Sequence, residues 1–372
     1  MSKKIKIAFI ISNLSQGGAE NQFLHLIKGI NKQLFDVHVI LYAYQSEAFF
    51  TEIFFIKNIS VKTKKLKYSF FLFKIIEALA YLRTTLSINK FDVVYTSLFM
   101  NGLFVRIAAS GYYKNKIVAS MRNSIKSYNI FYLFAEKYLI KKSFLVFNSK
   151  TPLIDFKNIS NEKIHNRLFS IYNGYNFNTN LKAIKNNNSI AITLGALGRQ
   201  TKQKNFIQLA RVFNKIHDNI NNLVFQGNSS DETSEINRLL NYDFTKYEMR
   251  KPSPNIDVFF KDINILVLPS YYEGCPNVLF EAMIRKTLCI ISVFANSDDF
   301  ITDGINGFIY DGSDEGLVKS LKSAISVIGT KKEEEITNNA FNYAAKNFSM
   351  EVMVHKYEEL FKNIYEKNKS SN

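Results

Sequence analysis

Short apolar runs typical of buried strands alternate with stretches of helical apolar spacing along the whole chain, and this alternation constrains the fold most. It favours strand–helix units with parallel sheets over a β-sandwich or a helical bundle. Between the first two runs, the apolar positions Ala19, Phe23, Leu26, Ile27 and Ile30 predict a helix. We expect strands at 5–12, 36–43, 92–98, 116–121, 143–148 and 168–172, and then at 190–195, 222–227, 245–249, 263–269 and 288–293.

The chain is long enough for two domains, since 372 residues are about twice an ordinary domain of roughly 150 residues. An Asn-rich stretch without apolar periodicity, residues 176–188, is typical of a linker. We expect an N-terminal domain over residues 1–178 and a C-terminal domain over residues 179–347. A last helix, within residues 348–372, follows the N-cap residue Ser349 and has one apolar stripe: Met353, Tyr357, Leu360, Phe361 and Ile364.

Composition excludes several classes of protein. With 47% hydrophobic and 22% charged residues, the chain has the balance of a globular protein, not of a disordered or fibrous one. Its two cysteines, Cys275 and Cys289, are too few for a disulfide-built secreted fold and favour a reducing cytoplasm. No apolar run is long enough to span a membrane. The opening run contains Lys6 and is interpreted as a buried strand, not a signal peptide.

The net charge of +16 is concentrated in the first half of the chain. Residues 1–185 contain 27 Lys and Arg against 9 Asp and Glu, whereas the remainder contains 21 against 23. The first half therefore carries +18 and the second half −2. This asymmetry favours a polyanionic partner for the first half, either nucleic acid or the anionic face of a membrane. The alternative is a soluble Lys-rich surface without such a partner.

The strongest local signal lies in residues 268–283, where a buried strand leads through a loop into a helix. Pro276 suits the first helical position, because its missing N–H group would lack a partner there. The unpaired N–H groups of the helix start face the carboxyl edge of the sheet and favour an anion such as phosphate. Glu273 and Glu281 flank this start, and carboxylates suit the vicinal hydroxyls of a sugar or ribose. The alternative is a surface glutamate and a capping glutamate.

Two glycine-containing turns add weaker signals. In the second half, a strand runs into such a turn, after which Arg199 and Lys204 flank the start of the next helix. Arginine offers a planar fork and lysine a mobile charge, which suits a diphosphate. In the first half, Gly17 and Gly18 lie between the first strand and the first helix, where paired glycines let the backbone approach a ligand.

Together these motifs resemble those of the family-4 retaining glycosyltransferases of the bacterial surface-polysaccharide type. The resemblance implies an α/β chain of two Rossmann-like domains facing across a cleft, the GT-B fold, with the last helix crossing back onto the first domain. It covers nearly the whole chain. The matching segments are Gly17-Gly18-Ala19-Glu20, Ile171-Tyr172-Asn173-Gly174, Gly198-Arg199 with Lys204-Asn205, the E-x7-E motif from Glu273 to Glu281, and Asp303-Gly304-Ile305-Asn306-Gly307-Phe308.

The resemblance implies a role for each matching residue. Arg199 and Lys204 hold the donor diphosphate and stabilise the departing nucleotide, and with Glu273 they form the catalytic set. Glu273 holds the donor sugar and Glu281 the ribose, while Gly17 of the acceptor-binding first domain closes over the diphosphate. The expected donor-binding residues are Gly17, Gly18, Gly198, Arg199, Lys204, Glu273, Gly274, Cys275, Pro276, Asn277, Val278 and Glu281, and the expected acceptor-binding residues are Arg122 and Asn123.

The resemblance also implies a reaction. A hexosyl or N-acetylhexosaminyl unit moves from a nucleotide sugar, UDP-linked by expectation, to a hydroxyl of a lipid-linked saccharide in O-antigen or capsule synthesis. The anomeric configuration is retained, with a leaving-group phosphate oxygen as the base. We expect no cofactor and no required metal, because the sequence has neither an Asp-x-Asp nor a Cys/His cluster. Residues 119–123 lack the histidine of many relatives, and residues 247–250 replace their Phe-x-Gly near the base.

A basic and aromatic segment predicts where a membrane is contacted. Lys62, Lys64, Lys65 and Lys67 precede the apolar residues 68–79, as in an interfacial segment that docks on anionic headgroups. The alternative is a core helix entered from a basic loop. We expect a peripheral enzyme on the cytoplasmic face of the cell membrane.

Two other functions stay open, a nucleotide-sugar epimerase of the same fold and a non-catalytic basic binding protein. We expect no nucleic-acid partner, because neither an RNA-reading aromatic motif nor a zinc finger is found in the sequence.

Overall fold

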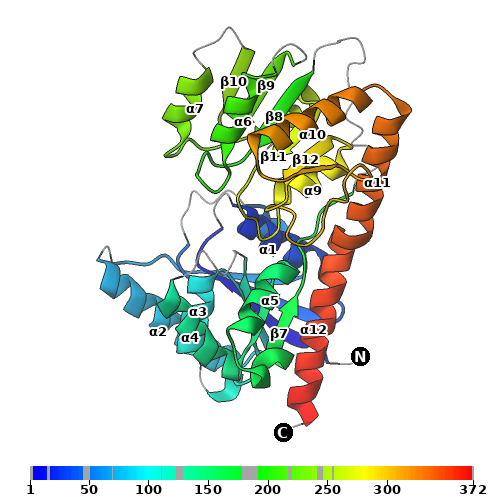
Figure 1. The fold of residues 1–372 in the computed structure, drawn as a ribbon. Coiled ribbons are helices and arrows are strands. Elements are labelled where there is room, and N and C mark those ends of the chain that lie inside the picture. Colours follow the sequence, from blue (N-terminus) through cyan, green and yellow to red (C-terminus); the bar gives the residue numbers. More distant parts are fainter. Residues whose placement is uncertain are drawn as a thin grey trace. The chain divides into compact units, whose positions relative to one another are not determined.

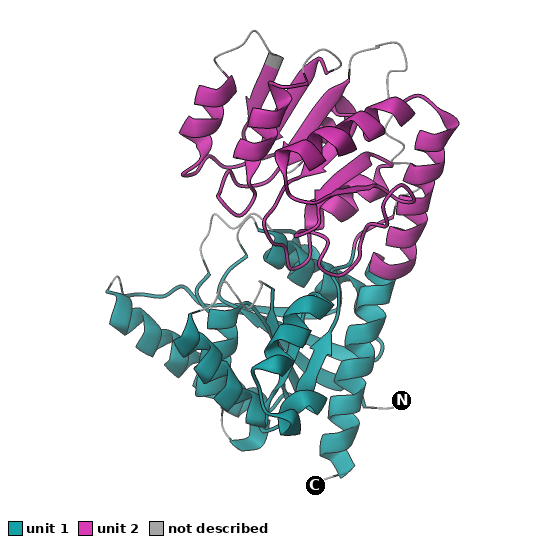
Figure 2. Ribbon diagram, viewed as in Figure 1, with its two compact units in different colours: residues 1–174, 350–372 teal, residues 175–349 magenta. Residues whose placement is uncertain are grey.

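The computed structural model describes residues 3–14, 17–44, 51–68, 70–109, 111–122, 129–177, 192–216, 220–240, 246–253 and 255–370. The chain divides into two compact units, coloured separately in Figure 2. Unit 1 comprises Met1–Gly174 and Met350–Asn372, and unit 2 comprises Tyr175–Ser349. The sequence places these boundaries after residues 178 and 347. Residues 178–188 of the expected linker lie outside the described residues.

Unit 1 is built on one parallel sheet of seven strands in the order β3-β2-β1-β4-β5-β6-β7. The chain begins in the middle of the sheet, builds outward to β3, and then crosses back to β4 on the other side of β1. This reversal is the doubly wound arrangement of a Rossmann-like domain. The strands are β1 (Ile5–Ile11), β2 (Phe35–Leu41), β3 (Ile59–Thr63), β4 (Val93–Ser97), β5 (Ile117–Met121), β6 (Phe144–Phe147) and β7 (Leu168–Ser170).

Helices cover both faces of this sheet (Figure 1). On one face, α1 (Gly18–Gly29) and α12 (Met350–Ser370) share a core with Phe9 and Val39. On the other face, α2 (Phe71–Asn89) and α3 (Phe99–Ala108) pack against Ile10 and Ile40. On that second face, α4 (Ile130–Leu139) and α5 (Lys150–Asn158) lie by a neighbouring core that includes Met121. Short 3₁₀ helices lie at Thr51–Phe55, Gly111–Tyr113, Ile140–Lys142 and Glu162–Arg167.

The last helix belongs to unit 1, as its apolar stripe predicts. The side chains of Met353, Tyr357, Leu360, Phe361 and Ile364 are all buried in the core that also contains β1, β2 and α1. The ring of Phe361 lies edge-on to Phe9, with 6.1 Å between the centroids. Unit 1 is therefore completed by a helix that follows unit 2 in the sequence.

Unit 2 has a parallel sheet of six strands in the order β10-β9-β8-β11-β12-β13. The order reverses between β8 and β11, as it does between β1 and β4 in unit 1, so unit 2 is doubly wound as well. Two parallel doubly wound sheets make up the GT-B fold that the sequence predicts. The strands are β8 (Thr193–Leu197), β9 (Asn222–Gln226), β10 (Lys246–Arg250), β11 (Ile265–Leu268), β12 (Leu288–Ser292) and β13 (Phe308–Tyr310).

The helices of unit 2 also pack on both faces of their sheet. α6 (Phe206–Phe213), α7 (Thr233–Leu240) and α10 (Asp314–Val327) share one core with Leu194, Ala196 and the inward residues of the neighbouring strands. Gly195 lies between Leu194 and Ala196 and faces the opposite side, where a Cβ atom would come within 2.8 Å of Phe259 in α8 (Asp257–Asp262). α9 (Asn277–Ile284) follows β11 and contacts α11 (Lys331–Phe348).

Two strands were missed by the sequence analysis. β3 lies at the edge of its sheet and has no fully buried residue, so the apolar signal of a core strand is weak there. It contains Lys62, which was expected in the basic part of an interfacial segment or, as the alternative, in a basic loop. β13 has three residues and also lies at an edge. The other expected strands are present with bounds shifted by one to three residues. In the described part of the chain, no helix combines the length and apolarity needed to cross a membrane.

Replacing Phe361 with alanine should lower the free energy of unfolding by about 3–5 kcal/mol, because the fully buried ring leaves a cavity beneath α12. Urea denaturation measures the loss. The exposed Glu366 lies one and a half turns further along the same helix, and Glu366→Ala is the control, with an expected change within about 0.5 kcal/mol. Equal losses in the two variants would contradict the packing of α12 described above.

Candidate active site

In unit 2, the point where the strand order reverses is the natural place for a ligand. Doubly wound sheets bind ligands at the carboxyl ends of the strands on either side of this point. Here these strands are β8 and β11. The loop after β8, residues 198–205, contains Arg199 and Lys204, and the loop after β11, residues 269–276, contains Glu273. The fold thus brings three predicted site residues to one edge of the sheet.

Lys204 and Glu273 are in direct contact. The Lys204 Nζ atom lies 2.6 Å from Glu273 Oε1, and the two side chains are 18% and 8% exposed. The same Oε1 atom accepts a hydrogen bond of 2.7 Å from Ser270 Oγ. Ser270 is held in turn, because its carbonyl oxygen accepts a bond of 2.5 Å from Ser292 Oγ. The Lys204–Glu273 pair is therefore largely shielded from water, and Ser270 and Ser292 fix the position of the Glu273 carboxylate.

Further hydrogen bonds join the two loops, one between backbone groups and two from side chains to backbone carbonyls. The Tyr271 N–H donates to the Gln203 carbonyl at 2.9 Å, and Gln203 Nε2 donates to the Tyr272 carbonyl at 3.0 Å. Asn205 Nδ2 donates to the Pro269 carbonyl at 3.2 Å. These bonds keep Lys204 and Glu273 in contact without relying on their own attraction. Asn205 belongs to a motif recognised in the sequence, but the supporting roles of Asn205, Gln203 and Ser270 could not be predicted, because polar loop residues carry no periodic signal.

A third loop, after β9, closes against the first. Gly227 has a φ of +150°, and a Cβ atom there would lie 1.9 Å from the carbonyl oxygen of Gly198. The Gly198 N–H donates to the Gln226 carbonyl at 2.9 Å. Gly198 itself has a φ of +151°, and a Cβ on it would lie 3.2 Å from Cε of Lys204. Glycine is therefore required at 227 for the two loops to touch, and glycine at 198 leaves room for the Lys204 side chain.

Arg199 extends from the same loop with an exposed side chain. Its carbonyl oxygen accepts a hydrogen bond of 2.9 Å from the Thr201 N–H, which tightens the turn. An exposed guanidinium and a shielded ammonium group on one loop are suited to bind a diphosphate, since two cations can contact different phosphate oxygens.

Glu281 lies inside α9, and its carboxylate belongs to a different cluster. Its Oε2 atom lies 2.6 Å from Nη1 of Arg285, one turn further along the helix. Arg285 also pairs with Asp257 of α8 at 2.7 Å. Burial raises the pKa of the Glu281 carboxyl, and the Arg285 guanidinium offsets part of that rise. The Glu281 carboxylate is thus paired with Arg285 and not with Lys204.

The start of α9 differs slightly from the expectation. Pro276 is the N-cap residue, and the helix begins at Asn277, one position later than predicted. Asn277 Oδ1 accepts a hydrogen bond of 2.6 Å from the Tyr175 hydroxyl. Cys275 and Val278 are buried, whereas Gly274 is half-buried. The helix start therefore lies at the carboxyl end of β11, next to Glu273.

In unit 1, Gly17 and Gly18 lie at the carboxyl end of β1, where Gly17 is the N-cap residue of α1. α1 is fixed by a reciprocal buried pair: Gln22 Nε2 donates to the Gly174 carbonyl at 3.0 Å, and the Gly174 N–H donates to Gln22 Oε1 at 2.8 Å. His25 Nδ1 lies 3.2 Å from the same carbonyl, and burial lowers the pKa of this imidazole. Two motifs far apart in the sequence thus meet within unit 1.

Arg122 follows β5 at the same carboxyl edge of unit 1. Its Nη1 atom donates to Asn173 Oδ1 at 2.6 Å, and its Nε atom donates to Ser97 Oγ at 3.1 Å. The guanidinium therefore connects the ends of β4 and β5 to the segment after β7. Asn123, the other expected acceptor-binding residue, lies outside the described residues.

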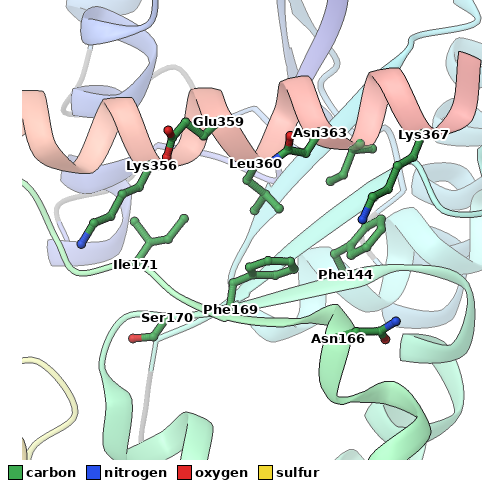
Figure 3. A pocket seen from close by; sticks show the side chains of 11 residues that line it. Phe144, Asn166, Phe169, Ser170, Ile171, Lys356, Glu359, Leu360, Asn363 and Lys367 are labelled. Atoms are coloured by element: carbon green, nitrogen blue, oxygen red, sulfur yellow. The ribbon is translucent and has the colours of Figure 1, made fainter.

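The described residues offer no metal site, and one hollow of unit 1 lies away from the predicted site. Among the described residues, no group of three His, Cys, Asp or Glu side chains could hold a metal ion. A hollow of about 280 Å³ lies between α12 and the β6–β7 side of unit 1. Figure 3 shows Leu360 extending from α12 toward Phe169 on the opposite side, with the polar residues Lys356, Glu359, Asn363 and Lys367 along α12. Its described lining includes none of the residues predicted for the site.

Residues 177–343 match the family model described as Glycosyl transferases group 1. This range nearly coincides with unit 2, which contains Arg199, Lys204, Glu273 and Glu281. This match agrees with the resemblance seen in the sequence motifs, over the part of the chain that carries the strongest of them.

Solved structures of other proteins have a similar fold at low sequence identity. HepE of Anabaena, solved with UDP and glucose, has a TM-score of 0.79 at 16% identity, with 96% of this chain and 100% of that chain covered. WaaG, a glycosyltransferase involved in lipopolysaccharide biosynthesis, has a TM-score of 0.69 at 13% identity, with 95% and 99% covered. These likenesses confirm the GT-B fold.

A curated relative matches over a shorter stretch. The chain is 30% identical over 88 residues to the amylovoran biosynthesis glycosyltransferase AmsD of Erwinia amylovora. The matched stretch covers 23% of this chain and 25% of that protein, so it spans about a quarter of the relative's length.

Replacing Gly227 with alanine should push the loops after β8 and β9 apart, because the new Cβ would overlap the Gly198 carbonyl. We expect a loss of about 1–3 kcal/mol in the free energy of unfolding, measured by urea denaturation. Gly304→Ala is the control: Gly304 has a φ of +69° and open space around its Cβ position, so it carries backbone strain alone, about 1 kcal/mol. A smaller loss at 227 than at 304 would contradict the close contact.

The raised pKa of Glu281 predicts a pH dependence. The folded protein holds this proton more tightly than the unfolded chain does, because burial disfavours the carboxylate. The contribution of Glu281 to stability therefore grows as the pH falls and is lost as the pH rises through the folded pKa. When the pH is lowered from about 7 to about 5, the free energy of unfolding of the parent, measured by urea denaturation, should rise relative to that of Glu281→Gln. A fall over the same range would mean that the Arg285 ion pair lowers the pKa of Glu281 by more than burial raises it.

Proposed function

Since the chain has the two sheets of the GT-B fold and residues 177–343 match the group 1 glycosyltransferases, we propose that the protein is a retaining hexosyltransferase with a UDP-sugar donor. The acceptor in this proposal is a hydroxyl of a lipid-linked saccharide in surface-polysaccharide synthesis. The observation that carries the proposal is the contact between Lys204 and Glu273 at the reversal point of the unit 2 sheet. In this proposal the Lys204 cation binds the diphosphate, and the neighbouring Glu273 carboxylate binds sugar hydroxyls.

The cations stabilise the leaving group. When the bond between the anomeric carbon and the diphosphate breaks, negative charge grows on the phosphate oxygens. Lys204 and Arg199 lie in one loop, and the backbone N–H groups at the start of α9 face the same edge of the sheet. Fixed cations and helix dipoles stabilise such a charge most when they need not rearrange. The hydrogen bonds between the loops supply this rigidity.

The carboxylates bind hydroxyl groups. Glu273 Oε1 accepts from Lys204 and Ser270, so the second carboxylate oxygen is the one assigned to the donor sugar. Glu281 is assigned to the ribose, with Arg285 holding its carboxylate in one orientation. Gly198 and residues 274–278 complete the proposed donor site in unit 2.

The transfer itself needs no protein base. The acceptor oxygen forms its bond to the anomeric carbon on the face from which UDP departs, so the configuration is retained. The acceptor proton passes to an oxygen of the departing phosphate. No metal is required in this scheme, because Arg199 and Lys204 supply the positive charge.

Unit 1 supplies the remaining proposed contacts. Gly17 and Gly18 are assigned to the donor, and Arg122 and Asn123 to the acceptor. The described members of this set lie at the carboxyl edge of the unit 1 sheet, where doubly wound domains bind ligands. Ser97 and Asn173 hold the Arg122 guanidinium at that edge, so it is positioned before a substrate arrives.

The relatives support the choice of donor and pathway. HepE was solved with UDP and glucose, which favours a uridine nucleotide. AmsD acts in amylovoran biosynthesis and WaaG in lipopolysaccharide biosynthesis, both of which favour a surface-polysaccharide product.

A lipid-linked acceptor places the enzyme at the cytoplasmic face of the cell membrane, as a peripheral protein. The charge of +18 over residues 1–185 supports this placement, since anionic headgroups attract such a surface. The start of α2 supports it as well: Phe70, Phe71, Leu72 and Phe73 are all more than half exposed. The deeper residues Ala78, Leu82 and Leu86 are buried, so α2 is a core helix with a projecting apolar first turn.

A panel of UDP-, GDP- and ADP-sugars, read by thermal stabilisation, tests the donor. We expect UDP-sugars to stabilise the parent, and Glu281→Ala to weaken this binding by about 1–3 kcal/mol through loss of the ribose contact. Glu315, an exposed carboxylate at the start of α10, provides the matched control Glu315→Ala, which should leave UDP-sugar binding unchanged.

Product analysis with a lipid-linked saccharide decides between the candidate reactions. Formation of a new glycosidic bond of retained configuration supports the proposal. Epimerisation of the donor without an acceptor, or stabilisation by GDP- or ADP-sugars alone, would contradict it.

A further inference from the structure

Helix α4 has its polarity reversed. Its most exposed side chains are apolar or aromatic: Ile130 is 62% exposed, Phe131 76%, Phe134 63% and Tyr138 68%. Its one fully buried side chain is the carboxylate of Glu136. A helix on the surface of a protein in water normally shows the opposite pattern. The sequence IFYLFAEKYL therefore belongs to a helix whose outer face is not made for water.

A buried ion pair fixes this orientation. Arg106 of α3 binds Glu136 with two parallel bonds, Nη1 to Oε1 at 2.5 Å and Nη2 to Oε2 at 2.7 Å. The two side chains are 3% and 0% exposed, and Arg106 Nε also donates to the Gly102 carbonyl at 2.8 Å. Rotating α4 to hide its aromatic residues would expose Glu136 and leave Arg106 buried without its partner, which is strongly unfavourable. The aromatic face is therefore held outward.

The neighbouring helices extend this face. α2, α3 and α4 cover the same side of the unit 1 sheet (Figure 1), and the rings of Phe99 in α3 and Tyr132 in α4 are 4.8 Å apart. Ile107 of α3 is 52% exposed, and the start of α2 projects Phe71 and Leu72. Exposed apolar side chains gathered on one side of a sheet in this way mark an interaction site.

Cations lie among the rings of α4. The ammonium groups of Lys137 and Lys141 are each 5.6 Å from a ring centroid, those of Phe134 and Tyr138 respectively. Beside them is an open hollow of about 710 Å³, which Lys137, Lys141 and Lys163 help to line. The only acidic residue of α4 is the buried Glu136. The outer face of the helix therefore combines aromatic rings with positive charge and carries no negative charge of its own.

We propose that α4 lies in the headgroup layer of an anionic membrane, with Phe131 and Phe134 among the acyl chains and the hollow beside Lys141 occupied by lipid phosphates. Exposed rings flanked by lysines are the composition of an interfacial helix. An acidic protein would satisfy the lysines but not the rings, and a second copy of this basic unit would be repelled. The inference deepens the proposed function, on which it rests for a membrane-bound acceptor, and makes α4 a membrane contact besides the start of α2.

Flotation of the full-length protein with vesicles tests this placement. The vesicles are phosphatidylcholine alone, or phosphatidylcholine with phosphatidylglycerol. We expect binding only to the anionic vesicles, and a fall of about tenfold in the partition coefficient for Phe131→Ser. Phe55→Ser is the matched control, because Phe55 is equally exposed, at 82% against 76%, but lies outside α2, α3 and α4. We expect the control to bind like the parent.

The double variant Lys137→Gln with Lys141→Gln tests the electrostatic contribution. Its binding to anionic vesicles should fall below that of the parent, and the difference should be largest at low salt.

Three outcomes would overturn the inference. The first is equal binding by Phe131→Ser and the parent, the second is equal binding to neutral and anionic vesicles, and the third is a dimer in light scattering that Phe131→Ser converts to a monomer. Stabilisation by UDP-sugars, measured on the same samples, reports on the donor site independently. Flotation without stabilisation by UDP-sugars would contradict the proposed donor but not the membrane contact. Stabilisation without flotation would contradict the membrane contact but not the proposed donor.

Discussion

The reversal of strand order at the centre of each parallel sheet is the constraint on which the rest of the structure depends. At this point the loops after two neighbouring strands turn toward opposite sides of the sheet, which leaves a crevice between them. Side chains that are distant in the sequence meet in this crevice. In unit 2 this brings Lys204 within 2.6 Å of Glu273, although 69 residues separate them. In unit 1 the corresponding edge holds Ser97, Arg122 and Asn173 together. Both units thus gather polar groups where the strands end, while their apolar residues are used in the cores.

The polar groups at these edges are held by residues outside the proposed binding set. Ser270 and Ser292 support Glu273, and Arg285 fixes Glu281. Supporting contacts of this kind matter because an electrostatic site works only when its charges need not rearrange around each ligand. The ion pair between Arg106 and Glu136 uses the same physics for another purpose. There, two charges buried against each other determine which side of a surface helix faces outward.

Much of the fold could be predicted because central parallel strands are buried on both faces and therefore appear as unbroken apolar runs. β3 and β13 could not, since an edge strand with half-exposed residues and a strand of three residues lack that signal. The motif residues Lys204 and Glu273 were predicted as neighbours in function, but their contact depends on tertiary packing. The inverted polarity of α4 was out of reach as well. Its apolar sequence predicts a buried helix, and only the partner of Glu136 determines which side is inside. Asn123 lies outside the described residues, so its assignment stays a prediction.

Unit 1 is assembled from two pieces of the chain, because α12 returns to it after the whole of unit 2. During synthesis, the ribosome has therefore released all of unit 2 before the stripe from Met353 to Ile364 can cover the face formed by β1, β2 and α1. Until then, that face keeps its apolar surface uncovered, as in other partly made domains. During synthesis, unit 2 can thus be completed before unit 1. A ribosome that stalls before residue 350 leaves unit 1 without α12 and its core uncovered on that face.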